Sequence, residues 1–81
     1  MSDVGIIFKI FAKENDTDAV IGELKELKPA GVSVEEIAFG IKAVKAFFKF
    51  DDSQITSASI EDKIRALKSV SEIEVVEESL L

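Results

Sequence analysis

Two segments with alternating apolar residues constrain the fold of this chain most strongly. They are residues 4–13 (VGIIFKIFAK) and 41–50 (IKAVKAFFKF). Successive side chains of a β-strand point to opposite faces, so each segment predicts a strand that buries one face. The predicted buried faces are Val4, Ile6, Phe8 and Ile10 in the first strand, and Val44, Ala46, Phe48 and Phe50 in the second.

Each of these strands is followed by a segment with helical spacing. After the first strand, Asp16 or Thr17 can cap a helix in which Val20, Leu24 and Leu27 recur every three or four residues. The sequence Pro-Ala-Gly at 29–31 ends this helix, because proline and glycine interrupt helical backbone.

A second helix is expected after the acidic turn at 51–53. Its predicted range is about Ser57 to Ser69, with Ser59 and Asp62 as a capping pair. Two weaker strands, at about 32–37 and 70–77, complete the order β-α-β-β-α-β.

This order predicts an α+β fold of the ferredoxin-like type. A four-stranded antiparallel sheet would carry both helices on one face, and the first and third strands would be central. The 81 residues (1–81) fit a single domain, since cores of one domain span about 50 to 250 residues. This fold has many functions and does not define one.

The composition excludes several kinds of chemistry. The chain has no Cys and no His, which removes disulfides, thiolate nucleophiles, cysteine-based zinc sites and the usual general base. The acidic pairs at 35–36, 51–52 and 77–78 are interpreted as solvated or turn residues, because neighbours on a strand point apart. We therefore expect no enzyme, no metal and no cofactor.

The charge and the hydropathy pattern bear on location. A net charge of −6 disfavours bulk attraction to nucleic acid or an anionic membrane. No apolar run approaches the roughly 20 residues of a membrane span, and Asp3 stands where a signal peptide would be basic. A cytoplasmic protein is expected.

The face of the predicted sheet that the helices leave open combines basic and aromatic residues. One hypothesis is a platform for single-stranded nucleic acid, where rings stack on bases and lysines meet phosphates. The simpler interpretation is a solvated face with lysine stems lying over the rings. A third hypothesis is a ligand-binding regulatory domain that dimerises through the sheet. The outward positions are Ile7, Lys9, Phe11, Lys13, Lys45, Phe47 and Lys49.

Phe39 lies in a short connection between two predicted strands and is followed by Gly40. The chain should turn and be exposed there. A Phe at such a tip either folds back onto the core as a lid or projects as an anchor for a partner.

The stretch IAFGIKAVKAFFKFDD (residues 37–52) resembles the central motif of translation elongation factor 1-beta, the guanine-nucleotide exchange factor of elongation factor 1-alpha. Members of this family carry a similar I-[AG]-[FY]-G-[IL]-K stretch, then an apolar strand, an acidic turn and an amphipathic helix. The opening Asp3-Val4-Gly5 is similar to the archaeal branch, whose members are free-standing domains of about this length.

The resemblance implies a function and a set of partner-binding residues. The domain would bind the nucleotide-binding and second domains of elongation factor 1-alpha, disturb its magnesium and phosphate site, and release GDP so that GTP enters. Phe39 would pack into the partner, Gly40 would keep the approach open, and Ile41-Lys42 would begin the central strand. The carboxyl-terminal Leu80 and Leu81 would also reach the partner. No direct contact with nucleic acid or membrane is expected.

Two features depart from the family pattern. Eukaryotic members carry a penultimate Lys that reaches toward the partner's magnesium site, whereas this chain has Leu80 there. The stretch between Gly31 and Ile37 is also shorter than the family pattern and has no proline before the motif.

Overall fold

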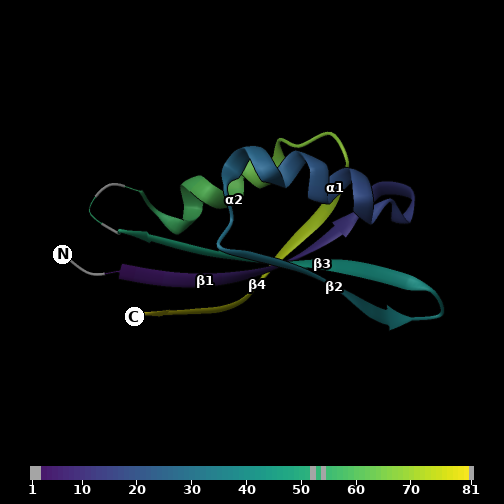
Figure 1. Cartoon of the computed structure of the whole chain (residues 1–81), viewed down its shortest axis with the longest axis horizontal. Helices are drawn as coiled ribbons and strands as arrows, with labels where there is room; N and C mark the ends of the chain where they lie inside the picture. Colours follow the sequence, from purple (N-terminus) through teal and green to yellow (C-terminus); the bar gives the residue numbers. More distant parts are fainter. Residues whose placement is uncertain (1–2, 52, 54, 81) are drawn as a thin grey trace.

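A computed structural model describes residues 3–51, 53 and 55–80 of the chain. One antiparallel sheet with the order β2-β3-β1-β4 forms one layer, and α1 and α2 lie together on one of its faces (Figure 1). This arrangement confirms the predicted ferredoxin-like α+β fold with the first and third strands in the centre. The elements are β1 (Asp3–Ala12), α1 (Thr17–Leu24), β2 (Gly31–Ala38), β3 (Ile41–Asp51), α2 (Ser57–Arg65) and β4 (Val70–Leu80), with short 3-10 turns η1 (Lys13–Asn15) and η2 (Lys25–Leu27).

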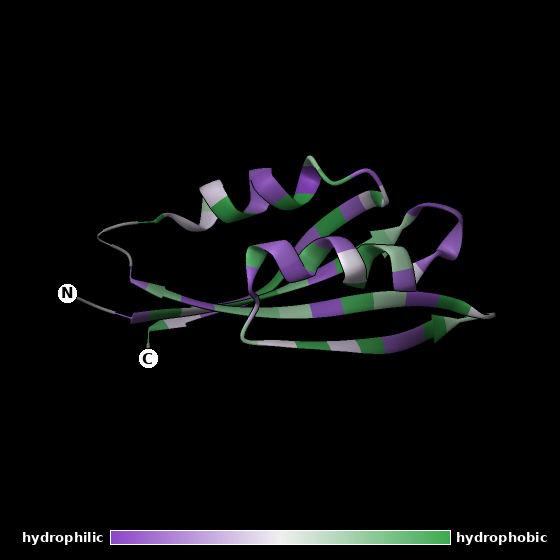
Figure 2. Ribbon diagram, turned by 45° about the horizontal axis from the view of Figure 1, so that its top comes forward, coloured by the Kyte–Doolittle hydropathy of each residue, from purple (hydrophilic) through white to green (hydrophobic). Residues whose placement is uncertain are grey.

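The core lies between the sheet and the helices. The predicted apolar faces of the two central strands are buried there except for Phe50, which is half-buried, and the rings of Phe8 and Phe48 meet edge to face with centroids 5.9 Å apart. Figure 2 shows the same alternation as green and purple bands along the strands. The helices contribute Val20 and Leu24 from α1, and Ile60 and Ile64 from α2.

Both helices are shorter than predicted. The α-helical hydrogen bonding of α1 stops at Leu24 and tightens into η2, so Leu27 lies outside the helix. The second helix ends at Arg65 instead of Ser69. Its cap is Thr56, whose hydroxyl accepts from the Ser59 amide at 3.1 Å, and not Ser59 itself. Ser59 lies inside the first turn, where its backbone N–H needs an acceptor.

The last strand is longer than predicted. It pairs with β1 as far as Val4↔Leu80, past the predicted end at Glu77. A register shift between Ile7 and Phe8 interrupts this ladder. Such an irregularity breaks the strict alternation of the two faces, and the prediction from alternation therefore ended the strand too early. The first strand is shorter, because Lys13 begins η1 and is not on the open sheet face as predicted.

The molecule is elongated, with principal extents of 42 × 22 × 16 Å. Figure 1 places both chain termini at one end of the long axis and the β2–β3 hairpin at the other. The two ends therefore present separate surfaces.

Candidate partner-binding site

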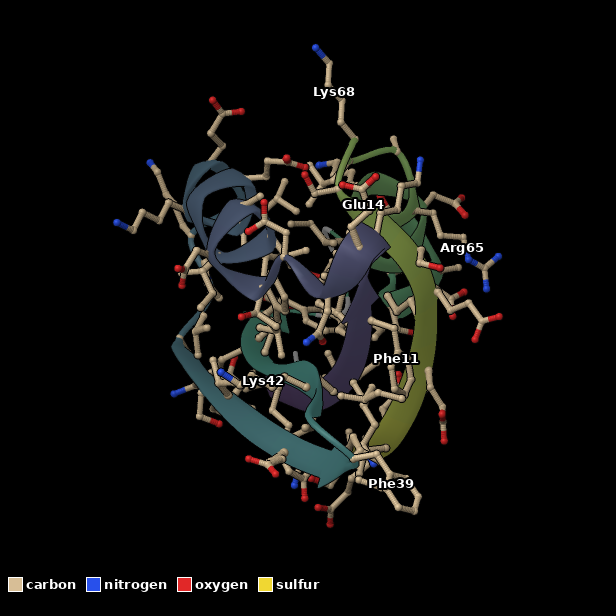
Figure 3. All side chains as sticks on the ribbon, turned by 90° about the vertical axis from the view of Figure 1, so that its right-hand side faces the viewer. Phe11, Glu14, Phe39, Lys42, Arg65 and Lys68 are labelled. Carbon is tan, nitrogen blue, oxygen red and sulfur yellow. The ribbon has the colours of Figure 1, made fainter. Side chains whose placement is uncertain are left out.

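Phe39 is the most exposed large apolar residue among the described residues, at 101% of its reference area. It is the first of two residues that connect β2 to β3, since Ala38 pairs with Ile41. Figure 3, which faces the hairpin end, shows its ring pointing into solvent. Of the two predicted possibilities, lid or projecting side chain, the structure has the projecting one.

The hairpin turn has an uncommon backbone. Phe39 has φ 51° and Gly40 has φ 79°, the positive values that a type I′ hairpin turn requires at both central residues. Glycine adopts this conformation at no steric cost, whereas a bulky residue rarely does. The turn therefore holds a Phe where hairpins usually have Asn, Asp or Gly.

The residues that flank Phe39 enlarge the apolar surface. Ile37 and Ile41 are 42% and 52% exposed, and a register shift between Glu36 and Ala38 lies within the strand end that carries Ile37. Lys42 is exposed and pairs with Glu36, so it lies on the sheet face opposite to that of Ile41. Figure 3 shows Lys42 and Phe39 pointing away from each other.

A residue far away in the sequence fastens this turn. The Asn15 side chain donates from Nδ2 to the Gly40 carbonyl at 2.9 Å and accepts from the Lys42 amide at 2.9 Å. The sequence interpretation missed Asn15, whose position beside Asp16 indicated only the start of a helix. The signal that could have identified Asn15 was its carboxamide side chain, placed between a predicted strand and a predicted helix, where it can hydrogen-bond to the backbone of another segment.

The other predicted site residues lie at the opposite end of the molecule. Leu80 is 72% exposed and ends β4 opposite Val4, whereas Leu81 lies outside the described residues. An open groove of about 420 Å³ runs beside Leu80 and the start of α2; it is lined by Val4, Phe50, Ile55, Thr56, Ser57, Glu78, Ser79 and Leu80. The structure thus separates the predicted residues 39–42 from Leu80.

Ion pairs cover part of the open face of the sheet. Glu35 Oε2 lies 3.8 Å from Nζ of Lys9 and 3.8 Å from Nζ of Lys45, and Lys9 also faces Glu74 across the β1–β4 ladder. Carboxylates therefore flank the central lysines on both sides. This arrangement weakens their attraction for phosphate.

Two carboxyl groups with lowered pKa values stabilise turns. Hydrogen bonds from the hydroxyl and the amide of Ser69 hold the pKa of Glu23 below its usual value. The amide and hydroxyl of Ser53 do the same to the pKa of Asp51. Each carboxylate fixes a chain segment next to a helix.

Within residues 3–51, 53 and 55–80, no group of three or more His, Cys, Asp or Glu side chains is arranged to hold a metal ion. The same part of the chain contains no helix that is long and apolar enough to cross a membrane.

The family described as the EF-1 guanine nucleotide exchange domain matches residues 6–81. The chain belongs to this family. It is also 28% identical over 85 residues to elongation factor 1-beta of Methanospirillum hungatei JF-1, with all of both chains covered.

These findings confirm the family that residues 37–52 indicated. As an EF-1 guanine nucleotide exchange domain, the chain acts in guanine nucleotide exchange during translation elongation. The archaeal relative also agrees with the predicted archaeal branch. The comparisons give no support to the nucleic-acid-binding alternative.

Proposed function

We propose that this exchange domain releases GDP from elongation factor 1-alpha by placing Phe39 in an apolar pocket of that GTPase. The observation that carries the proposal is a fully exposed aromatic ring on a turn with a strained backbone. Folding alone does not favour such a residue, whereas a buried aromatic at the centre of an interface contributes strongly to affinity.

The mechanism requires no covalent step. A factor accelerates GDP release when it binds the nucleotide-free GTPase more tightly than the GDP-bound form. We attribute this difference in affinity to contacts that the domain makes with the nucleotide-free GTPase and not with the GDP-bound form. The absence of His and Cys from the sequence is compatible with that role.

The elongated shape supports two points of contact. Phe39 and Leu80 lie at opposite ends of a molecule whose longest extent is 42 Å. One end of the domain contacts the nucleotide-binding domain of the GTPase and the other end contacts its second domain. Because Leu80 is apolar, its end displaces magnesium indirectly, by moving groups of the partner, and not with a cation of its own.

The experiment is the release of fluorescent GDP from purified archaeal elongation factor 1-alpha at fixed magnesium, with increasing amounts of this protein. We expect the release rate to rise with dose and then saturate. A GTPase preparation that responds to another exchange factor but not to this protein would contradict the proposal. Binding to RNA that weakens steeply with salt would instead favour the open sheet face as the functional surface.

A further inference from the structure

The turn that carries Phe39 has little support from its own hairpin. Its strand β2 is an edge strand, and its side chains from Gly31 to Ala38 are exposed apart from the half-buried Glu35. A register shift precedes Ala38, so the regular ladder is interrupted just before the turn. A tip of this kind is expected to fluctuate unless another contact holds it.

Asn15 provides such a contact from outside the hairpin. It follows β1, a central strand of the sheet, and lies 25 residues from Gly40 in the sequence. Its two hydrogen bonds, both 2.9 Å long, reach the backbone on the two sides of Ile41. The side chain thus connects the Phe39 turn to the end of a buried strand.

The chemistry of these contacts selects asparagine. One side chain must donate to a carbonyl and accept from an amide at the same time, as a carboxamide does. An aspartate could only accept, and its second oxygen would face the Gly40 carbonyl. Asn15 also has φ 58°, a left-handed conformation that asparagine tolerates better than most residues.

We propose that Asn15 is a positioning residue that holds the Phe39 turn in its partner-binding conformation, an inference that rests on the proposed function of Phe39. A turn that is ordered before binding loses less conformational freedom in the complex. If only a fraction of molecules had the turn ordered, the apparent affinity would fall by that fraction. Asn15 therefore sets how much exchange factor is needed and leaves the release rate at saturation unchanged.

The first part of the test uses the free protein and needs no partner. Hydrogen exchange of the Lys42 amide is measured by NMR in the wild type, N15A and the control I64V. Because N15A removes the acceptor, we expect exchange about tenfold faster. I64V trims a fully buried core residue of α2 and should leave this local opening unchanged. Equal Lys42 exchange in N15A and the wild type would overturn the proposal.

The second part titrates each variant in the GDP-release assay. In N15A we expect the half-saturating concentration to rise about five- to tenfold, with the rate at saturation unchanged. N15D keeps the acceptor for the Lys42 amide but sets an oxygen against the Gly40 carbonyl, so its half-saturating concentration should also lie above that of the wild type. I64V should match the wild type, which separates positioning from general loss of stability.

A double variant tests whether Asn15 acts through Phe39. In the F39A background, N15A should cause little further loss, since there is no ring left to position. If N15A weakened GDP release as much in the F39A background as in the wild type, the positioning role would be overturned. It would also be overturned if N15A lowered the release rate at saturation and left the half-saturating concentration unchanged. If the wild type itself does not accelerate release, the proposed function fails, and the Lys42 measurement still decides whether Asn15 holds the turn.

Discussion

At the scale of single residues, Phe39 combines full exposure with a left-handed backbone. Neither feature stabilises the fold, because the ring stays in water and the left-handed backbone is costly for a residue with a Cβ atom. Phe8 shows the opposite case: the same side chain is fully buried in the core. The contrast indicates that Phe8 stabilises the fold, whereas Phe39 does not and is available for the proposed contact with a partner.

Replacement of Phe39 by alanine should therefore separate the two properties. F39A should keep its free energy of unfolding within about 0.5 kcal/mol of the wild type, since an exposed side chain contributes little. Its catalysis of GDP release below saturation should fall at least about tenfold, as for an interface hot spot. Urea unfolding and fluorescent GDP release measure the two effects. Unchanged release by folded F39A would contradict the binding role.

Glu23 and Ser69 give a pH-dependent contribution to stability. Because hydrogen bonds from Ser69 lower the pKa of Glu23 in the folded state, this contribution is present above the ordinary glutamate pKa of about 4.3. It is lost as the pH falls through that value toward the lower folded pKa. S69A removes the hydroxyl that donates to Glu23 Oε2 at 2.6 Å, so it should destabilise more at pH 7 than at pH 3.

Urea unfolding at the two pH values provides the measurement. S71A is the matched control, because Ser71 is an exposed serine of β4. An identical loss of stability in S69A at both pH values would mean that the Glu23 interaction does not change the carboxyl pKa.

At the scale of elements, the β2–β3 turn depends on Gly40. A Cβ atom at Gly40 would meet no heavy atom within 4 Å, so any cost of substitution comes from its φ of 79°. G40A should lower the free energy of unfolding by about 1 kcal/mol, whereas G40N should lose less, because asparagine tolerates this conformation. Urea unfolding of both variants checks this order. If G40A had the same free energy of unfolding as the wild type, residue 40 would not have a positive φ in the folded protein.

The elements also show what could be predicted from the sequence. The alternation around Phe8 and Val44 predicted the two central strands and their buried faces, because burial of one face imposes a period of two. Phe39 followed by Gly40 between two strands predicted an exposed turn. Each of these features is determined by residues that are close together in the sequence, and it could therefore be predicted from the sequence alone.

Other features depend on contacts between distant segments. Asn15 holds Gly40 across 25 residues, and no periodicity records such a bond. The extension of β4 to Leu80 depends on pairing with the start of β1, which supplies hydrogen bonds to a segment of weak strand propensity. The bridging of two lysines by Glu35 depends on the register of β2 with β3.

At the scale of the whole molecule, the two ends should act independently. Phe39 and Leu80 lie at opposite ends of the 42 Å axis and are proposed to contact different domains of the GTPase, so their contributions should be additive in free energy. L80A should reduce GDP release below saturation about fivefold, as expected for loss of a modest interface contact. The F39A/L80A double variant should show the product of the two single effects. A double variant no worse than F39A would limit the contact surface to the hairpin end.

The proposed exchange mechanism requires that the domain distinguish the nucleotide-free from the GDP-bound GTPase. The most direct test is the equilibrium affinity of this protein for each form of archaeal elongation factor 1-alpha, together with the affinity of the GTPase for GDP with and without the factor. We expect tighter binding to the nucleotide-free form, and a loss of GDP affinity by the same factor, since thermodynamic coupling is reciprocal. Equal affinity of the domain for the two forms of the GTPase would contradict the exchange mechanism.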